Sequence, residues 1–237
     1  YWRRLRPVTD RYNPGFGYTM KPIFQFFTLL FLSALSNSAV SAQPGSARHQ
    51  LDTFAEGLDS LQARFRQVVI SSDGRMQDSS EGKVWLNRPD LFRWEYGGDF
   101  PELVVADGKS IWIYDEALEQ VTVKDQASAR GSSPLALLTA PDRLDEKFEI
   151  REAGETEALQ LLELRARDME TEFERLLAGL NDNVLELLIM EDAFGLRTEI
   201  RFSEIQRNPD IDPVLFRFEP PAGSDVIGDL PVAPQER

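Results

Sequence analysis

The chain has 237 residues, 42% of them hydrophobic, which is enough apolar surface for a sizeable core in one domain. It contains no cysteine, so disulfides, thiol nucleophiles and thiolate metal sites are excluded. Its net charge of −14 disfavours nucleic acid and anionic membranes as partners, because both repel an acidic surface.

Residues 20–42 have the pattern of a secretory signal peptide. Lys21 supplies the positive start, an apolar run covers residues 23–35, and small residues precede a cleavage site after Ala42. The apolar run is shorter than the roughly 20 residues that span a bilayer, which favours a cleaved signal over the alternative of an uncleaved anchor. We therefore expect export to the periplasm.

The signal peptide divides the chain into three parts. Residues 1–19 precede the natural-looking start Met20 and are expected to lie outside the fold. Residues 43–237 are expected to form a single domain that is ordered from about residue 47 to about residue 227.

The first expected element after the signal peptide is an amphipathic helix. Apolar residues recur there at spacings of three and four, namely Leu51, Phe54, Leu58, Leu61 and Phe65. This spacing places them on one face of a helix. Because a strand-like segment follows, the helix is predicted to end between residues 60 and 63.

The next stretch, residues 82–115, is predicted to form short strands with large apolar side chains on both faces. It contains Trp85, Trp94 and Trp112, and successive side chains of a strand point to opposite faces. An antiparallel sheet with one wet face should instead alternate apolar and polar residues. Either a second layer covers each face, or one face is kept apolar for a ligand.

A short helix is predicted for residues 134–139, after the alternating strand 119–125. Ser133 can cap it and Pro134 can begin it. A helix of this length is marginal in isolation. Because it is almost entirely apolar, it should pack on an apolar surface or move.

From residue 147 onward the pattern is that of strands separated by turn residues. The predicted strands are residues 147–150, 158–166, 184–192, 196–205 and 214–220. Residues 173–180 are ambiguous between helix and strand. Short strands at this spacing favour a β-sandwich or barrel.

The search for an active site is largely negative. The only histidine is His49, and no nucleotide-binding or zinc-protease motif is present. Carboxylates are plentiful, so a glycosidase-like pair stays possible, but they are spread as on a solvated surface. The prediction is a protein that is not an enzyme and needs no metal or cofactor.

Arg88 is the charged residue that stands out, because it precedes Pro89 at the end of a predicted strand. Its five N–H donors suit it to bind the free carbonyl groups of a neighbouring element. The alternative is an ordinary surface arginine.

Several motifs together resemble one known family, the periplasmic outer-membrane lipoprotein carriers of the LolA type. They are Gly82-x-Val-Trp-Leu-x-Arg88-Pro89-x-Leu-Phe92-x-Trp94, Val105-Ala-Asp107-Gly108-x-x-Ile-Trp112-x-Tyr114, Pro134-x-x-Leu-Leu138, Asp192-x-x-Gly195 and Phe216-x-Phe218-x-Pro220-Pro221-x-Gly223-x-Asp225-Val226. The likeness covers residues 51–227.

The resemblance implies a mainly β fold, an incomplete antiparallel β-barrel whose apolar cavity is covered by short helices. It implies a carrier that takes triacylated lipoproteins from an inner-membrane ABC-type complex and delivers them to an outer-membrane receptor, and we expect a monomer. It also implies that Arg88 holds the lid closed. The candidates for lining the acyl-chain cavity are Phe54, Leu58, Phe65, Trp85, Phe92, Trp94, Trp112, Leu135 and Leu138.

Other functions stay open. A periplasmic lipid-binding sensor or regulator domain can have a similar fold, and so can a scavenger of small lipids. An enzyme acting on lipid head groups is a further alternative. Solubilisation of a lipoprotein would separate a carrier from a sensor, and turnover of a phospholipid would reveal an enzyme.

Overall fold

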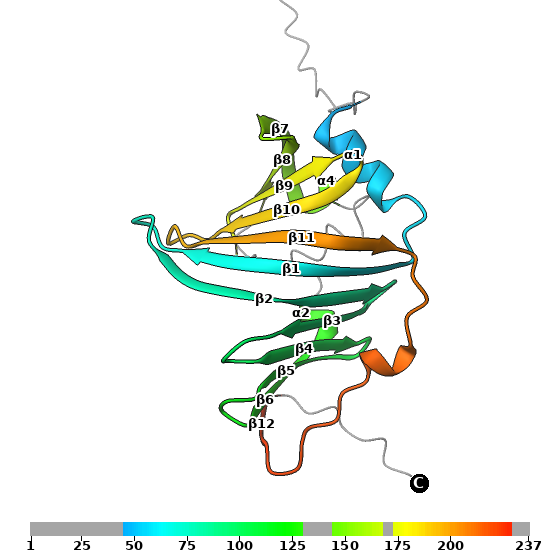
Figure 1. Ribbon diagram of the computed structural model, residues 1–237, viewed down its shortest axis with the longest axis vertical. Coiled ribbons are helices and arrows are strands. Elements are labelled where there is room, and N and C mark those ends of the chain that lie inside the picture. Colours follow the sequence, from blue (N-terminus) through cyan, green and yellow to red (C-terminus); the bar gives the residue numbers. More distant parts are fainter. Residues whose placement is uncertain (1–44, 130–143, 168–172, 229–237) are drawn as a thin grey trace, which may run out of the picture. The chain divides into compact units, whose positions relative to one another are not determined.

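A single sheet of twelve strands dominates the computed structural model, which describes residues 45–129, 144–167 and 173–228 (Figure 1). Its strand order is β12-β6-β5-β4-β3-β2-β1-β11-β10-β9-β8-β7. Every neighbouring pair is antiparallel except β12 and β6, which are parallel. Because β12 and β7 are at opposite ends of this order, the sheet is not closed. The predicted mainly β, unclosed architecture is therefore confirmed.

The strands are connected mostly by hairpins, with a few short helices. The elements are α1 (Ala47–Ala55), β1 (Ser60–Ile70), β2 (Met76–Asn87), β3 (Leu91–Tyr96), β4 (Glu102–Asp107), β5 (Ser110–Asp115), β6 (Gln120–Asp125), α2 (Gln126–Ala129), α4 (Leu144–Lys147), β7 (Phe148–Thr156), β8 (Leu159–Ala166), β9 (Arg175–Asn181), β10 (Val184–Glu191), β11 (Arg197–Arg207), the 3-10 helix η2 (Pro213–Phe216) and β12 (Asp225–Gly228).

Helix α1 is shorter than predicted. It begins at the cap Ser46, whose Oγ accepts a hydrogen bond from the His49 N–H at 3.2 Å, and it ends at Ala55. Gly57 follows with φ +62°, outside the helical region. Leu61 and Phe65 belong to β1, so the predicted end between residues 60 and 63 was wrong. A spacing of four fits one face of a strand as well as one face of a helix, which explains the error.

The strands predicted for the first half of the chain are confirmed, and so is the turn between β4 and β5. The Asp107 carboxylate accepts hydrogen bonds from the N–H groups of Lys109 and Ser110, each at 2.8 Å, and from Trp112 Nε1 at 2.9 Å. Burial raises the pKa of Asp107, but these hydrogen bonds together outweigh it, so that the pKa lies below its usual value. Gly108 completes the turn at φ +94°.

In the second half, the ambiguous residues 173–180 contribute strand β9. The strand predicted for residues 214–220 was wrong, because η2 begins that segment. Asp212 caps the turn by accepting a hydrogen bond from the Val214 N–H at 3.0 Å, and Pro213 has the fixed φ that suits a first helical residue. Local cap and proline chemistry therefore override the strand-like alternation.

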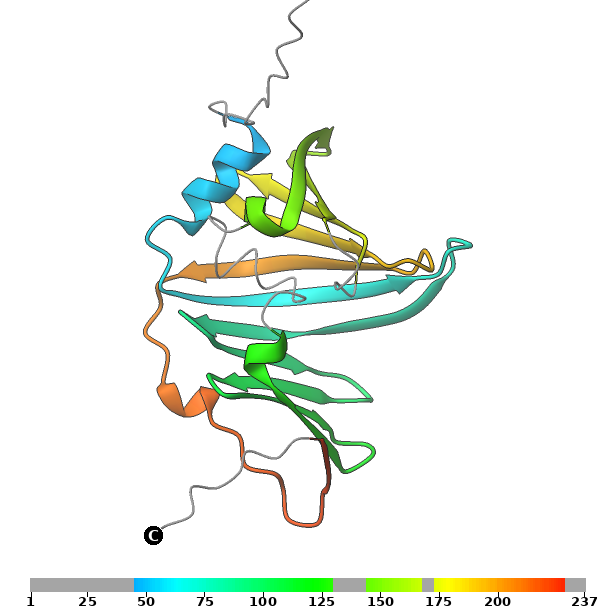
Figure 2. The same ribbon diagram turned by 180° about the vertical axis from the view of Figure 1, so that it is seen from behind.

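Helices pack on one face of the sheet and the C-terminal segment packs on the other, so each face carries apolar contacts. We call the face on which α1 packs the inner face; there Leu51 and Phe54 of α1 join Phe65, Leu86 and Trp94 in the main core. Figure 2 shows α1, α2 and α4 on the near side of the sheet.

The outer face is covered by the C-terminal segment. Ile211 and Phe216 pack on Trp85, and Phe218 packs on Trp112, with ring centroids 5.7 Å apart. Arg93 fixes η2 there, because its Nη1 donates to the Leu215 carbonyl oxygen at 3.1 Å.

Some predictions concern residues outside the described ranges, namely those for residues 1–42, for the helix 134–139 and for the tail beyond residue 228. In the described part of the chain, no helix has the length and apolar character needed to cross a membrane. Nor do the described residues include a group of side chains that could hold a metal ion.

Candidate apolar ligand-binding face

The inner face carries cross-strand rows of apolar side chains. In one row Trp94 of β3 is paired with Val104 of β4, and Val104 with Ile113 of β5. In the adjacent row Phe92 is paired with Ala106, and Ala106 with Ile111. Paired residues of neighbouring strands point to the same face, so each row is continuous.

The side chains in these two rows differ in how deeply they are buried. Trp94 is 7% exposed, whereas Phe92, Val104, Ile111 and Ile113 are only half-buried. Phe92 and Val104 still pack against the main core. We call these four half-buried residues the open patch. Because the patch adjoins the core, a hydrocarbon chain that packs on it would be buried as a continuation of the core.

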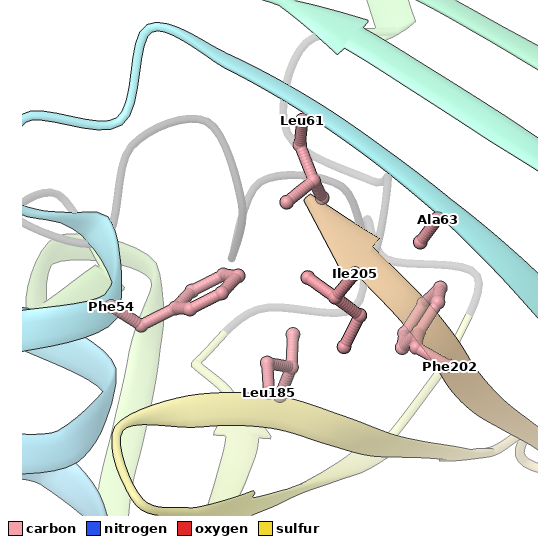
Figure 3. Close-up of a pocket in the computed structure, with 6 residues that line it drawn as sticks. All are labelled: Phe54, Leu61, Ala63, Leu185, Phe202 and Ile205. Atoms are coloured by element: carbon pink, nitrogen blue, oxygen red, sulfur yellow. The ribbon is translucent and has the colours of Figure 1, made fainter. Parts of the chain in front are cut away.

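A small cavity lies on the same face between α1 and the sheet (Figure 3). Figure 3 shows its lining side chains converging from α1, β1, β10 and β11. They are Phe54, Leu61, Ala63, Leu185, Phe202 and Ile205. All six are apolar, so the cavity offers water no side-chain hydrogen bonds and suits a hydrocarbon group better.

The structure brings four of the predicted cavity residues together in the main core. These are Phe54, Leu58, Phe65 and Trp94, each no more than 7% exposed. The rings of Phe65 and Trp94 meet edge to face with centroids 4.7 Å apart. Of the remaining candidates, Phe92 lies in the open patch, and Leu135 and Leu138 lie outside the described residues.

The structure separates Trp85 and Trp112 from this group. Trp85 is paired with Gln62 and Arg93, whose side chains lie on the outer face, and Trp85 Nε1 donates to Gln62 Oε1 at 3.2 Å. Trp112 packs with Val105 and Val123 in a second outer cluster. Both tryptophans are therefore covered by the C-terminal segment and are not candidates for lining an inner-face cavity.

Arg88 lies at the rim where β2 turns into β3, next to the Phe92 row. Its backbone N–H donates to the Asp59 carbonyl oxygen at 2.8 Å, which fixes the turn against the start of β1. The residue is half-buried, and its Nε is buried without a hydrogen-bond acceptor among the described residues. A buried donor of this kind costs free energy until it finds an acceptor.

Gln126 joins two turns at the same rim. Its Nε2 donates to the Asp90 carbonyl oxygen at 2.5 Å, and its Oε1 accepts from the Gly108 N–H at 3.0 Å. Gln126 as a whole is 5% exposed, so these bonds are shielded from water. The turns that flank the Phe92 row are thus held in fixed positions.

Three residues of the open patch, Val104, Ile111 and Ile113, were not singled out from the sequence. The available signal was the hairpin register. Once Phe92 is placed on the inner face, counting across the β3–β4 and β4–β5 turns places Ala106 and Ile111 in its row.

Comparison with known proteins identifies the family. The family model described as outer membrane lipoprotein carrier protein LolA matches residues 56–219. The outer-membrane lipoprotein carrier protein of Dechloromonas aromatica is 41% identical over 180 residues, which is 76% of this chain and 86% of that protein. The protein of the same name from Xanthomonas campestris pv. campestris (strain B100) is 42% identical over 185 residues, with 77% and 88% covered.

A solved structure supports the fold. An uncharacterized conserved protein from Thermus thermophilus superposes with a TM-score of 0.50 at 16% identity, covering 76% of this chain and 98% of that chain. The family match spans β1 to η2 and thus includes the open patch and Arg88. The chain belongs to the LolA family of outer membrane lipoprotein carrier proteins.

Proposed function

We propose that this protein is a periplasmic carrier that shields the acyl chains of outer-membrane lipoproteins on the inner face of its sheet. The observation that supports this most is the open patch, four half-buried apolar side chains of which Phe92 and Val104 pack against the main core. The relatives named outer-membrane lipoprotein carrier protein give the cargo class.

We further propose that the site binds without catalysing a reaction. Phe92, Val104 and Ile113 carry no acid, base or nucleophile, so they can offer a bound chain only apolar contact. Recognition by apolar contact fits a carrier that accepts many different proteins through one shared lipid group.

The route of the cargo follows from the family resemblance. We propose that the carrier works as a monomer, receives triacylated lipoproteins from an inner-membrane ABC-type complex and passes them to an outer-membrane receptor. No cofactor enters this scheme, because hand-off requires only a difference in affinity between donor, carrier and receptor.

The energetics require that binding be weaker than full burial allows. Burial of one methylene is worth about 0.8 kcal/mol, so three enclosed acyl chains offer on the order of 30 kcal/mol. Known non-covalent affinities end near roughly 20 kcal/mol. A carrier that realised all of this energy would not release its cargo. Either the chains are enclosed only in part, or a stable empty state opposes binding.

We propose that Arg88 contributes to such an empty state by holding a cover segment through its guanidinium. Two observations support this role: Arg88 lies at the rim beside the Phe92 row, and its buried Nε lacks an acceptor among the described residues. The apolar segment 134–139, with Leu135 and Leu138, is the cover that the sequence favours.

A release assay tests the proposed function. Spheroplasts that hold a labelled triacylated lipoprotein are mixed with the purified chain from residue 43 onward, and the soluble fraction is counted. The expected result is a soluble one-to-one complex of lipoprotein and carrier. If none forms although a fluorescent fatty acid binds, the carrier function is wrong, and the sensor or the small-lipid scavenger takes its place.

Replacing Arg88 with Leu is expected to tighten acyl binding and to slow transfer to the receptor. Loss of the guanidinium destabilises the empty closed state. The free energy that acyl binding must supply to open this state is then smaller, so the net affinity rises. The measurements are the Kd for a fluorescent fatty acid and the transfer rate in the release assay.

Arg201→Leu is the matched control, since Arg201 lies on the outer face and contacts only Glu157, at 3.7 Å, among the ion pairs of the described residues. Transfer at an unchanged rate in Arg88→Leu would exclude the proposed role.

A further inference from the structure

Strand β2 is longer than its neighbour β3, and this leaves part of one edge unpaired. β2 is paired with β1 from Met76 to Asn87, but its pairing with β3 begins only at Gly82, opposite Tyr96. Residues 76–80 therefore have no strand on the β3 side in the described structure. Figure 1 shows β1 and β2 extending past the β3–β4 hairpin. At about 3.3 Å per residue the free edge is roughly 16 Å long.

The backbone directions along this edge can be assigned. The Gly97 N–H donates to the Glu81 carbonyl oxygen at 2.8 Å, so the backbone groups of Glu81 point away from β1. Alternate residues of a strand direct their N–H and C=O groups to the same side. Ser79 therefore offers one free donor and one free acceptor on the open side.

Apolar side chains flank the free edge at both ends. Met76 at the start of β2 is 67% exposed, and Phe100 on the β3–β4 hairpin is 81% exposed. Natural sheets shield edges with charged side chains, proline, bulges or a covering loop. The segment Met-Gln-Asp-Ser-Ser of residues 76–80 contains neither lysine nor proline, and its shielding is limited to Asp78 and to a register shift next to Met76, which leaves Ser79 and Ser80 in regular strand. This edge has the chemistry of a docking site for an added strand.

The charges on this edge indicate the kind of strand that fits. Asp78, Glu81 and Asp99 are exposed, and none of them has an ion-pair partner among the described residues. A second copy of the chain would bring the same acidic groups against them, which disfavours an edge-to-edge dimer.

We propose that residues 76–80 are a docking edge for an extended segment of another protein, one that alternates basic and apolar side chains. Its backbone pairs with Ser79. The register with β1 places Asp78 on the inner face of β2 and Met76 on the outer face. The basic side chains of the added strand, which share one face, therefore face Asp78, and its apolar side chains contact Met76. This surface is separate from the open patch, so the proposal does not depend on acyl binding. Strand addition of this type obtains affinity from main-chain hydrogen bonds and specificity from side chains.

A short blocked peptide of alternating lysine and valine is the probe. It is titrated into the purified chain while nuclear magnetic resonance follows the backbone amides of residues 76–82. The expected result is a shift and slower hydrogen exchange at the Ser79 amide. A peptide of alternating glutamate and valine should bind more weakly.

Substitutions at Ser79 separate backbone pairing from side-chain contact. Ser79→Pro removes only the outward N–H and leaves the β1–β2 hydrogen bonds in place, so it should abolish binding. Ser79→Ala keeps the N–H and should bind as the unmodified chain does. Thermal unfolding shows whether each variant is folded. Should Ser79→Pro fail to fold, the double variant Asp78→Lys with Glu81→Lys provides the test, because it should reverse the preference between the two peptides.

Three outcomes would overturn the proposal. They are equal binding by the folded proline and alanine variants, an unreversed peptide preference in the double lysine variant, and protection of Ser79 that rises with chain concentration in the absence of peptide. The last would show that a second copy occupies the edge.

Discussion

Replacing Gly82 with Ala should destabilise the fold by about 3 kcal/mol, because the added methyl group has no room. A Cβ at Gly82 would collide with the Glu95 carbonyl oxygen and would lie 2.8 Å from two ring carbons of Phe65. Gly82 is paired with Phe65 and Tyr96, whose rings meet across it with centroids 5.0 Å apart. Neither a backbone carbonyl nor a packed ring can move aside cheaply. The measurement is the free energy of unfolding in urea.

Gly97→Ala is the matched control in the adjoining hairpin. A Cβ there would meet only the Glu81 carbonyl oxygen at 3.6 Å, an ordinary contact, so the change should alter the free energy of unfolding little. Similar losses in the two variants would mean that β2 and β3 can separate to accommodate a methyl group. The row from Phe65 to Tyr96 would then be less tightly packed than the structure shows.

The sequence was sufficient for features set by local chemistry. Alternation identified most strands, and the turn at Asp107 and Gly108 followed from residue types that favour turns. The family motifs depended on these same residues, so the fold class and the family followed as well. Both were confirmed.

Features set by distant packing could not be predicted from the sequence. Alternation shows that Trp85 and Trp94 can be on opposite faces, but not which face is the inner one. That depends on α1, about 30 residues earlier in the chain, and on the C-terminal segment that packs on Trp85. Local patterns were also misleading where two structures share a spacing, as at Leu61 and Phe65.

The second large effect is expected at the open patch, where Ile113→Asp should lower the affinity for a fluorescent fatty acid by about tenfold or more. A carboxylate there must lose its water or be neutralised when an acyl chain covers it, which costs roughly 1–3 kcal/mol or more. Because Ile113 is half-buried, the empty protein can keep the new charge in contact with water and remain folded. The measurements are the Kd from fluorescence and the free energy of unfolding.

Leu118→Asp, in the β5–β6 turn, is the control for an added charge, since Leu118 is 68% exposed and lies outside the apolar rows. It should leave the affinity unchanged. Normal binding by a folded Ile113→Asp variant would show that the acyl chain does not cover the β4–β5 part of the inner face. The cavity beneath Phe54 would then be the alternative site. The choice between these two sites decides how binding relates to Arg88. The open patch lies in the apolar rows beside Arg88, so a chain bound there can couple directly to release of the cover segment that Arg88 is proposed to hold.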